Sequence, residues 1–235
     1  MDINFKVLEK KTGVIANLSN DTFPTKVLSW GVDNKPLNVD GKNDTSFGYV
    51  FSGKATLRYN NLEFPLNAGM YFSVPENFEI SGGSGIIITA LNKKALFHIG
   101  GPVEEKGRLK YIDGCSDTLL IAPWLKGEAC LNHLHFPSNI TQTIHTHPSN
   151  RIGIVTKGNG ICKANGKTYT LSPGTIWIIP TNCEHGFFTK EQEMDVVSFH
   201  PDSDFGPEHE NHPMINRTIV EGKSARDMKE IQTKD

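Results

Sequence analysis

Two histidines separated by one residue, His145 and His147, are the feature of this sequence with the clearest chemistry. On an extended strand the side chains at positions i and i+2 point to the same face, so these two imidazoles lie close enough to bind one metal ion. Such sites often carry a carboxylate a few residues further along, but this chain has Arg151 there. The pattern indicates a metal site in which a cation stands where an anionic ligand is expected.

The segments that must position these histidines are repeated in the first half of the chain. Residues 48–69 (GYVFSGKATLRYNNLEFPLNAG) align without a gap with residues 153–174 (GIVTKGNGICKANGKTYTLSPG), and the register continues from 70–80 into 175–185. Identities at so many turn residues are not expected by chance, so the chain is predicted to be two copies of one module. The identical pairs include Gly48 with Gly153, Gly53 with Gly158, Leu66 with Leu171, Gly69 with Gly174, and Pro75 with Pro180.

Each copy consists of short alternating runs between Gly, Asn and Pro turns, a pattern typical of β-strands. Asn165-Gly166 is a signal for a two-residue hairpin, because both positions tolerate a positive φ, and Asn60-Asn61 stands at the equivalent place. Modules of this kind close into barrels or sandwiches that bury their strand edges. We therefore predict an all-β fold of two tandem barrels.

The C-terminal residues depart from this pattern. Residues 224–232 (SARDMKEIQ) predict a short helix with Ser224 as its N-cap. Residues 200–218, rich in Pro, His and Asp, are expected to form an ordered loop over one barrel mouth, with Asp202, Asp204, His209 and His212 as polar lid groups or as a solvated turn.

The second copy resembles the cupin superfamily, and the chain as a whole resembles a bicupin. The first cupin motif, G-x5-H-x-H-x3,4-E-x6-G, keeps its spacing here at Asn139, His145, His147, Arg151 and Gly158. The second motif, G-x5-P-x-G-x2-H-x3-N, keeps its spacing at Gly174, Pro180, Asn182, His185 and Thr189. The resemblance implies two jelly-roll (double-stranded β-helix) barrels: an N-terminal cupin over 1–110, a C-terminal metal-type cupin over 111–205, and a loop with a short helix over 206–235.

The resemblance also implies that His185 joins His145 and His147 in a three-histidine metal site inside the C-terminal barrel. Neutral imidazoles suit several divalent transition metals, and three of them leave open positions for water, substrate or O2. Fe2+ is the expected ion, with Zn, Ni or Mn as alternatives. In the first copy the corresponding positions hold Asp40, Lys42, Ser46 and Ile80, so that half is expected to be a scaffold without metal.

Arg151 changes the expected role of the site. Beside a divalent ion its guanidinium would be opposed by like-charge repulsion and by desolvation, unless an anion lay between the two. A substrate carboxylate or phosphate can bind the metal with one oxygen and the arginine through a bidentate pair of hydrogen bonds. The alternative is that Arg151 points out of the barrel or pairs with a nearby carboxylate.

Five further residues are candidates for the pocket. Gln142 is a candidate oxygen ligand or substrate contact, and His200, at the end of a predicted strand, is a candidate acid/base group with a surface role as the alternative. His133 and His135, a second H-x-H pair, are assigned to the pocket lining, with ordinary strand positions near the surface as the alternative. Trp177 is expected to form a wall of the core or of the pocket.

Composition excludes several classes of function. The net charge of −2 and the scattered Lys and Arg residues give no basic surface for nucleic acid or an anionic membrane. No apolar run approaches the ~20 residues of a membrane span, and the N-terminus lacks the features of a signal peptide. The four cysteines form no C-x-x-C pair and favour reduced, buried thiols in a cytoplasmic protein.

The sequence is therefore interpreted as a metal-binding bicupin, most simply a non-haem dioxygenase (an oxidoreductase) acting on a small carboxylated or enolisable substrate. A metal-dependent isomerase or lyase of a sugar or keto acid is one alternative, and a non-catalytic cupin that binds a small ligand is another. A homodimer is expected from the resemblance to other bicupins.

Overall fold

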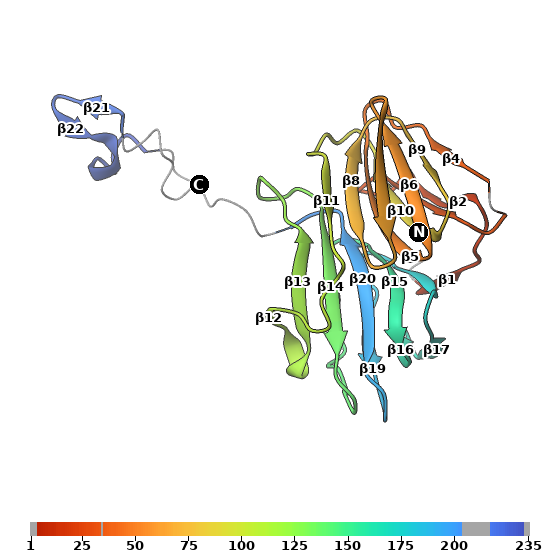
Figure 1. Ribbon diagram of the computed structural model, residues 1–235. Coiled ribbons are helices and arrows are strands. Elements are labelled where there is room, and N and C mark those ends of the chain that lie inside the picture. The colour runs from red at the N-terminus through yellow and green to blue at the C-terminus, as the bar shows by residue number, and fades with distance from the viewer. Residues whose placement is uncertain (1–3, 34, 204–216, 233–235) are drawn as a thin grey trace.

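The structure is a computed structural model, which describes residues 4–33, 35–203 and 217–232 of the 235-residue chain. Strands supply nearly all of the regular structure in these ranges and form two β-sandwiches, one above the other in Figure 1. The prediction of an all-β fold with two barrels is confirmed. No helix in the described ranges is long and apolar enough to cross a membrane.

The N-terminal sandwich consists of two sheets that enclose one apolar core. Its six-stranded sheet has the order β11-β8-β5-β10-β3-β2, with β2 (Gly13–Leu18), β3 (Thr25–Trp30), β5 (Thr45–Ser52), β8 (Tyr71–Pro75), β10 (Ser84–Ala90) and β11 (His98–Gly100). Its four-stranded sheet has the order β4-β9-β6-β7, with β4 (Leu37–Val39), β6 (Lys54–Tyr59), β7 (Leu62–Asn67) and β9 (Phe78–Ser81).

The C-terminal sandwich is built in the same way around a second core. Its seven-stranded sheet has the order β1-β18-β15-β20-β14-β13-β12, with β1 (Lys6–Leu8), β12 (Leu109–Lys110), β13 (Ser116–Ile121), β14 (Cys130–Phe136), β15 (Arg151–Gly158), β18 (Ile176–Ile179) and β20 (Met194–His200). Its three-stranded sheet has the order β17-β16-β19, with β16 (Gly160–Ala164), β17 (Lys167–Leu171) and β19 (His185–Phe188). A short 3-10 turn, Ile112–Gly114, precedes β13.

The internal repeat is visible in the sheet topology. The central order β8-β5-β10-β3 of the first sandwich recurs as β18-β15-β20-β14 in the second. The predicted hairpin turns also correspond, because Asn60, Asn61, Asn165 and Gly166 all have positive φ, at 50°, 61°, 46° and 75°. Two copies of one module are thus present in three dimensions as well as in sequence.

One packing detail is repeated with the module. In each large sheet a glycine lies directly opposite an aromatic residue, Gly48 opposite Phe72 and Gly153 opposite Trp177. A Cβ atom built on either glycine would overlap the facing ring. The missing side chain therefore lets the ring lie flat across the strand, as glycine–aromatic pairs in sheets do.

We predict that Gly153→Ala destabilises the protein by about 1–3 kcal/mol, because the added methyl group overpacks a filled core. Thermal or denaturant unfolding measures the change. Combining Gly153→Ala with Trp177→Leu should cost less than the sum of the two single changes, since the smaller residue makes room. Simple additivity in this double-mutant cycle would contradict the packing explanation, and Gly48→Ala with Phe72→Leu provides the same test in the other sandwich.

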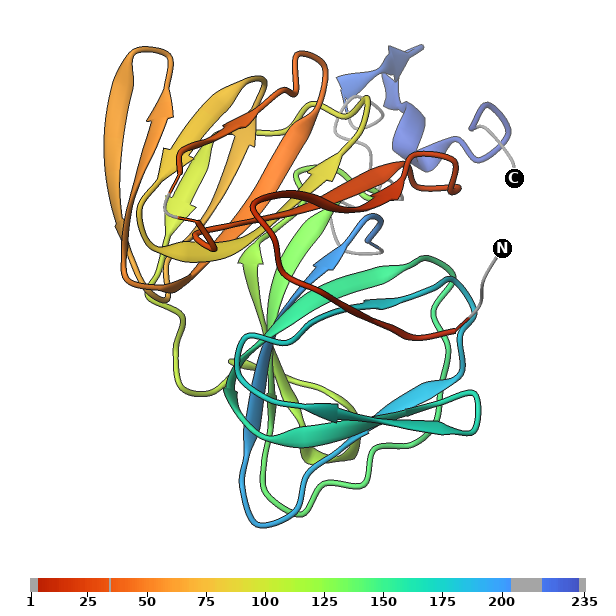
Figure 2. The same cartoon turned by 90° about the vertical axis from the view of Figure 1, so that its right-hand side faces the viewer.

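The two sandwiches pack through the outer faces of their large sheets, seen edge-on in Figure 2. A third apolar cluster fills this contact, and it includes Phe47 from β5 and Phe199 from β20, whose ring centroids are 5.2 Å apart. The central strands of both large sheets are consequently buried on both faces. This contact explains why almost every residue of β10 and of β20 is buried.

The first strand departs from the division at residue 110 expected from the sequence. Strand β1 pairs with β18 of the C-terminal sandwich, with Val7 opposite Trp177. Phe5, just before it, packs between Tyr169 and Trp177 at centroid distances of 4.7 and 6.2 Å. The edge position that β11 fills in the first sandwich is filled in the second by the start of the chain.

The predicted helix over residues 224–232 is wrong. The segment follows a small hairpin, β21 (Ile219–Val220) with β22 (Lys223–Ser224), and holds only a 3-10 turn at Ala225–Asp227. Ser224 does cap this turn, since its hydroxyl accepts a hydrogen bond from the Arg226 N–H. Short helices need a packed apolar face, and Ala225 is the one buried residue of this segment. Most of the predicted mouth loop, with Asp204, His209 and His212, lies outside the described residues.

Candidate metal centre

The three histidines selected by the motif spacing meet at one point of the C-terminal sandwich. One ring nitrogen from each of His145, His147 and His185 lies within 4.8 Å of those of the other two. Backbone pairing brings them together: His145 N–H donates to the His185 carbonyl at 2.9 Å, and His185 N–H donates to the His145 carbonyl at 3.0 Å. These three nitrogens form a cluster that can bind a metal ion.

Two of the rings are oriented by hydrogen bonds to the backbone. His145 Nδ1 lies 2.7 Å from the Thr143 carbonyl and His185 Nδ1 lies 2.9 Å from the Cys183 carbonyl. A carbonyl only accepts, so each Nδ1 carries the proton and each Nε2 keeps its lone pair. This is the tautomer that a metal ligand needs, fixed by the kind of support that ligating histidines usually have.

Burial keeps two of the ligand candidates, His147 and His185, neutral. It lowers the pKa of His147 to about 3, with the nearby Arg151 charge as the next cause. Burial is also the main cause that lowers the pKa of His185 to about 4. Since a metal ion binds the unprotonated imidazole, both rings are in the binding form at neutral pH.

The cluster opens into two adjoining cavities. The inner one, about 40 Å³, is bounded by the three histidines and by apolar side chains of β14, β18, β19 and β20. The outer one has about 440 Å³, enough for a small organic molecule. The two cavities share five lining residues: Tyr111, Asp117, His147, Arg151 and His200.

Arg151, the first residue of β15, lines both cavities and also has a carboxylate partner. Its Nη1 donates to the Asn150 carbonyl at 3.1 Å and pairs with Asp202 at 3.4 Å. The Ser149 hydroxyl bonds to both Arg151 and Asp202. The Arg151 Nε is buried without a hydrogen-bond partner among the described residues. Arg151 therefore lines the pocket and also belongs to an ion pair, so the two alternatives do not exclude each other.

Three other predicted pocket residues lie at the inner cavity. Gln142 is buried, and its Oε1 accepts a hydrogen bond from Phe187 N–H at 3.1 Å, so that oxygen is already used by the protein. Trp177 is buried, with its Nε1 unpaired among the described groups. Burial, with the Arg151 charge as the next cause, lowers the pKa of His200 well below its usual value, and its ring is neutral at neutral pH.

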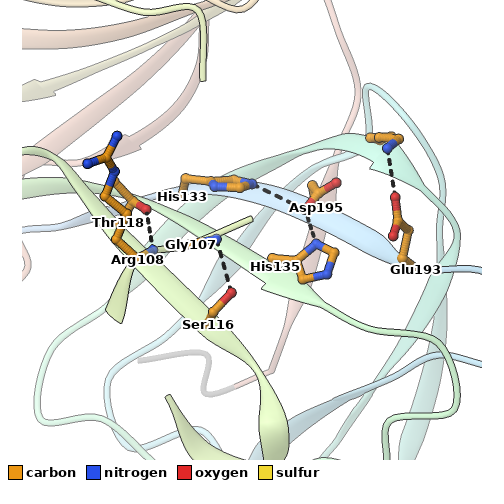
Figure 3. A network of polar contacts seen from close by, with 9 residues as sticks. Gly107, Arg108, Ser116, Thr118, His133, His135, Glu193 and Asp195 are labelled. Atoms are coloured by element: carbon orange, nitrogen blue, oxygen red, sulfur yellow. Dashed lines mark hydrogen bonds and ion pairs between the residues drawn. The ribbon is translucent and has the colours of Figure 1, made fainter. Parts of the chain in front are cut away.

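The assignment of His133 and His135 to the pocket is corrected by the structure. Both lie on β14 but project from its other face, where they share the Asp195 carboxylate (Figure 3). His133 Nε2 and His135 Nδ1 donate to Asp195 Oδ1 at 3.2 and 2.7 Å. Every residue of β14 is buried, because one face meets the barrel core and the other the remaining protein. The alternation of side chains along β14 therefore does not show which of its two buried faces carries His133 and His135.

Two residues that line both cavities, Asp117 and Tyr111, are not among those predicted from the sequence. Asp117 belongs to β13, which has no place in either motif, and it accepts two hydrogen bonds from Asn132 Nδ2, at 2.9 and 3.0 Å. Tyr111 immediately precedes the short turn at Ile112–Gly114. Ser116 and Thr118 stand on either side of Asp117 in β13, so the pattern of this strand does not single Asp117 out.

The equivalent region of the first sandwich has a different character. Ile80, at the position of His185, is completely buried in the apolar core. Ser46, at the position of Arg151, exchanges a hydrogen bond with Thr89 at 2.8 Å. The described residues contain one cluster of His, Cys, Asp or Glu side chains able to hold a metal ion, and it is the C-terminal one.

Comparison with known proteins identifies the fold. Residues 132–200 match the family model of the cupin domain, and these residues include all three histidines of the cluster. No curated protein matches the chain. The resemblance to the cupin superfamily inferred from the two motifs is confirmed over this range.

Solved structures extend the similarity to both sandwiches. A cupin 2 conserved barrel domain protein from Leptotrichia buccalis is 14% identical with a TM-score of 0.57, over 85% of this chain and 88% of that one. Protein Ylba from E. coli is 15% identical with a TM-score of 0.61, over 88% and 94%. A salicylate 1,2-dioxygenase from Pseudaminobacter salicylatoxidans is 10% identical with a TM-score of 0.59, over 82% and 76%. At these identities the likeness shows the fold.

Proposed function

We propose that this chain, which has the cupin fold and a cupin domain at residues 132–200, is a metal-dependent dioxygenase for a small anionic substrate. The observation that carries the proposal is the convergence of three histidines, two of them oriented by hydrogen bonds to the backbone, on a cavity that Arg151 also lines. His145, His147 and His185 would hold the ion. Fe2+ is the preferred ion, with Zn, Ni or Mn as alternatives.

The three histidines fit a divalent transition metal by their chemistry. They supply three nitrogen ligands, and three protein ligands leave coordination positions open. A bound Fe2+ would supply the redox chemistry of O2 and would polarise a coordinated oxygen of the substrate. Within the described part of the chain, no carboxylate joins this cluster. An anionic substrate would therefore balance the charge of the ion.

Arg151 is proposed to bind the anionic end of that substrate. Its side chain is 11% exposed and lines both cavities, and its Nε lacks a partner among the described groups. The ion pair with Asp202 holds the Arg151 guanidinium in place, as supporting residues often do for the groups that bind a ligand. A small carboxylated or enolisable molecule fits this division, with one group toward the metal and its carboxylate toward Arg151.

The proposed function is tested by metal analysis followed by an oxygen assay. We expect untagged protein, purified without chelators, to contain about one iron per chain, a ratio that elemental analysis measures directly. The iron protein should then consume O2 in the presence of one or more small hydroxylated carboxylic acids from a panel. Protein that neither contains nor takes up any divalent transition metal would contradict the proposal.

A metal-dependent isomerase or lyase is the second candidate, and one observation favours it. Asp117 places a carboxylate at the cavity beside the histidines, which is what proton-transfer chemistry on a sugar or keto acid requires. Stoichiometric zinc, manganese or nickel without oxygen uptake would favour this candidate. Metal-free protein that still binds a small acid would instead support the non-catalytic alternative, and the homodimer stays a prediction that light scattering can test.

A further inference from the structure

Among the residues that the structure describes, Asp117 is the one acidic side chain that lines both cavities. Its other neighbours in these walls are Tyr111, Arg151 and His200, and Lys110 and Asp202 line the outer cavity as well. Asp202 already pairs with Arg151, whereas Asp117 makes no ion pair with any described residue. Among the residues described here, Asp117 is therefore the anionic group at the inner cavity whose charge is not matched by a cation.

Asp117 is also held in a fixed position. Asn132 Nδ2 donates to both carboxylate oxygens, at 2.9 and 3.0 Å. The Asn132 amide is oriented in turn by Cys130, whose thiol donates to Asn132 Oδ1 at 3.1 Å. A carboxylate oxygen has more than one lone pair, so this arrangement fixes the group and leaves it able to accept a further proton.

We propose that Asp117 accepts the proton that a hydroxylated or enolisable ligand gives up when it binds at the metal centre. The ligand's O–H bond breaks, its electron pair stays on the ligand oxygen, and a new O–H bond forms on the Asp117 carboxylate, which becomes neutral. No oxidant or reductant is involved. This inference rests on the proposed function, and it names the catalytic base that both enzymatic candidates lack in the motifs.

Three other titratable groups in these walls, Tyr111, Cys130 and His200, are unsuited to the task. Burial raises the pKa of Tyr111 and raises that of Cys130 to about 12, so both are protonated at neutral pH. Burial and the Arg151 charge lower the pKa of His200 well below its usual value, so the His200 ring does not readily accept a proton. Asp117 has the opposite tendency, because burial raises the pKa of its carboxyl and favours the neutral acid after transfer.

The test counts protons released on binding to zinc-loaded protein, in which no redox turnover occurs. The probe is 5-nitrosalicylate, which has a carboxylate for Arg151 and a hydroxyl whose ionisation changes its absorption. Calorimetry in buffers of different ionisation enthalpy gives the number of protons released per probe bound. We expect close to zero for the wild type and close to one for Asp117→Asn, since the variant has no acceptor and the proton passes to the buffer.

Matched measurements separate this role from a structural one. Asp117→Glu keeps the carboxylate and should keep the low proton release. The analogue 2-methoxy-5-nitrobenzoate has no hydroxyl proton, so the wild type and Asp117→Asn should release equal numbers. In the wild type alone, an infrared difference spectrum should show a new protonated-carboxyl stretch when 5-nitrosalicylate binds, a result that does not depend on any variant folding.

The outcomes distinguish the two levels of the proposal. Equal proton release by the wild type and Asp117→Asn, or no protonated carboxyl in the wild-type spectrum, would overturn the role of Asp117 and leave the metal centre intact. Zinc that does not bind, or a probe that binds equally with and without zinc, would overturn the proposed function and this inference with it.

Discussion

Replacement of His185 with alanine is expected to leave a protein that no longer retains a stoichiometric metal ion. His185 is buried, and it contributes one of three ligand nitrogens that lie within 4.8 Å of one another. Loss of a supporting hydrogen bond around a metal ligand costs roughly 10–100-fold in metal affinity, so loss of the ligand itself should cost more. Elemental analysis after dialysis against a weak chelator measures the effect.

Matched variants make this result specific. His145→Ala should lose metal to a similar extent, although His145 is partly exposed and its removal disturbs the core less. His98→Ala removes an exposed histidine of the N-terminal sandwich that stacks on Tyr71, and it should retain metal like the wild type. Wild-type metal content in both His185→Ala and His145→Ala would show that these residues are not the ligands.

The Arg151→Leu variant is expected to weaken binding of 5-nitrosalicylate to the zinc-loaded protein by roughly 10–100-fold, with metal content unchanged. Hydrogen bonds to charged groups contribute about 1.5–3 kcal/mol, and the variant loses at least one such contact together with its charge. Absorbance titration of the probe measures the affinity. Arg151→Lys keeps the charge but not the planar fork, and it should recover part of the loss.

The neutral amide of the same probe, 5-nitrosalicylamide, provides the control for charge. Its affinity should change little in Arg151→Leu, because it presents no carboxylate to the guanidinium. A variant that loses metal but still binds the carboxylate would place the function of Arg151 elsewhere. In that case the Asp202 ion pair would be a structural support of the β15 start and not part of an anion site.

The fold was predictable because its signals are local and occur twice. Turn glycines and asparagines fix strand ends wherever φ must be positive, and the two copies carry them in the same register. The three histidines were predictable for a related reason, since a bridge between His145 and His185 joins the two motifs. The spacing of the histidines along the chain was sufficient to predict the cluster because backbone pairing between the two motifs fixes their relative positions.

The rest depended on contacts that periodicity does not encode. His133 and His135 lie on a strand buried on both faces, so their burial did not reveal which side they occupy. Asp117 reaches the cavity from β13, and only the pairing of β13 with β14 brings its carboxylate to Asn132. The failed helix at residues 224–232 shows the converse case, in which a local preference found no apolar surface to stabilise it.

The pairing of β1 with β18 has a consequence for the order in which the protein is made. During synthesis Phe5 and Val7 leave the ribosome well before their partners Tyr169 and Trp177. The N-terminal sandwich can assemble early, because the strands of both its sheets lie within residues 13–100. Strand β1 can pair only after β18 has been made. Its pairing with β18 then places Phe5 against Trp177 and completes that side of the C-terminal core.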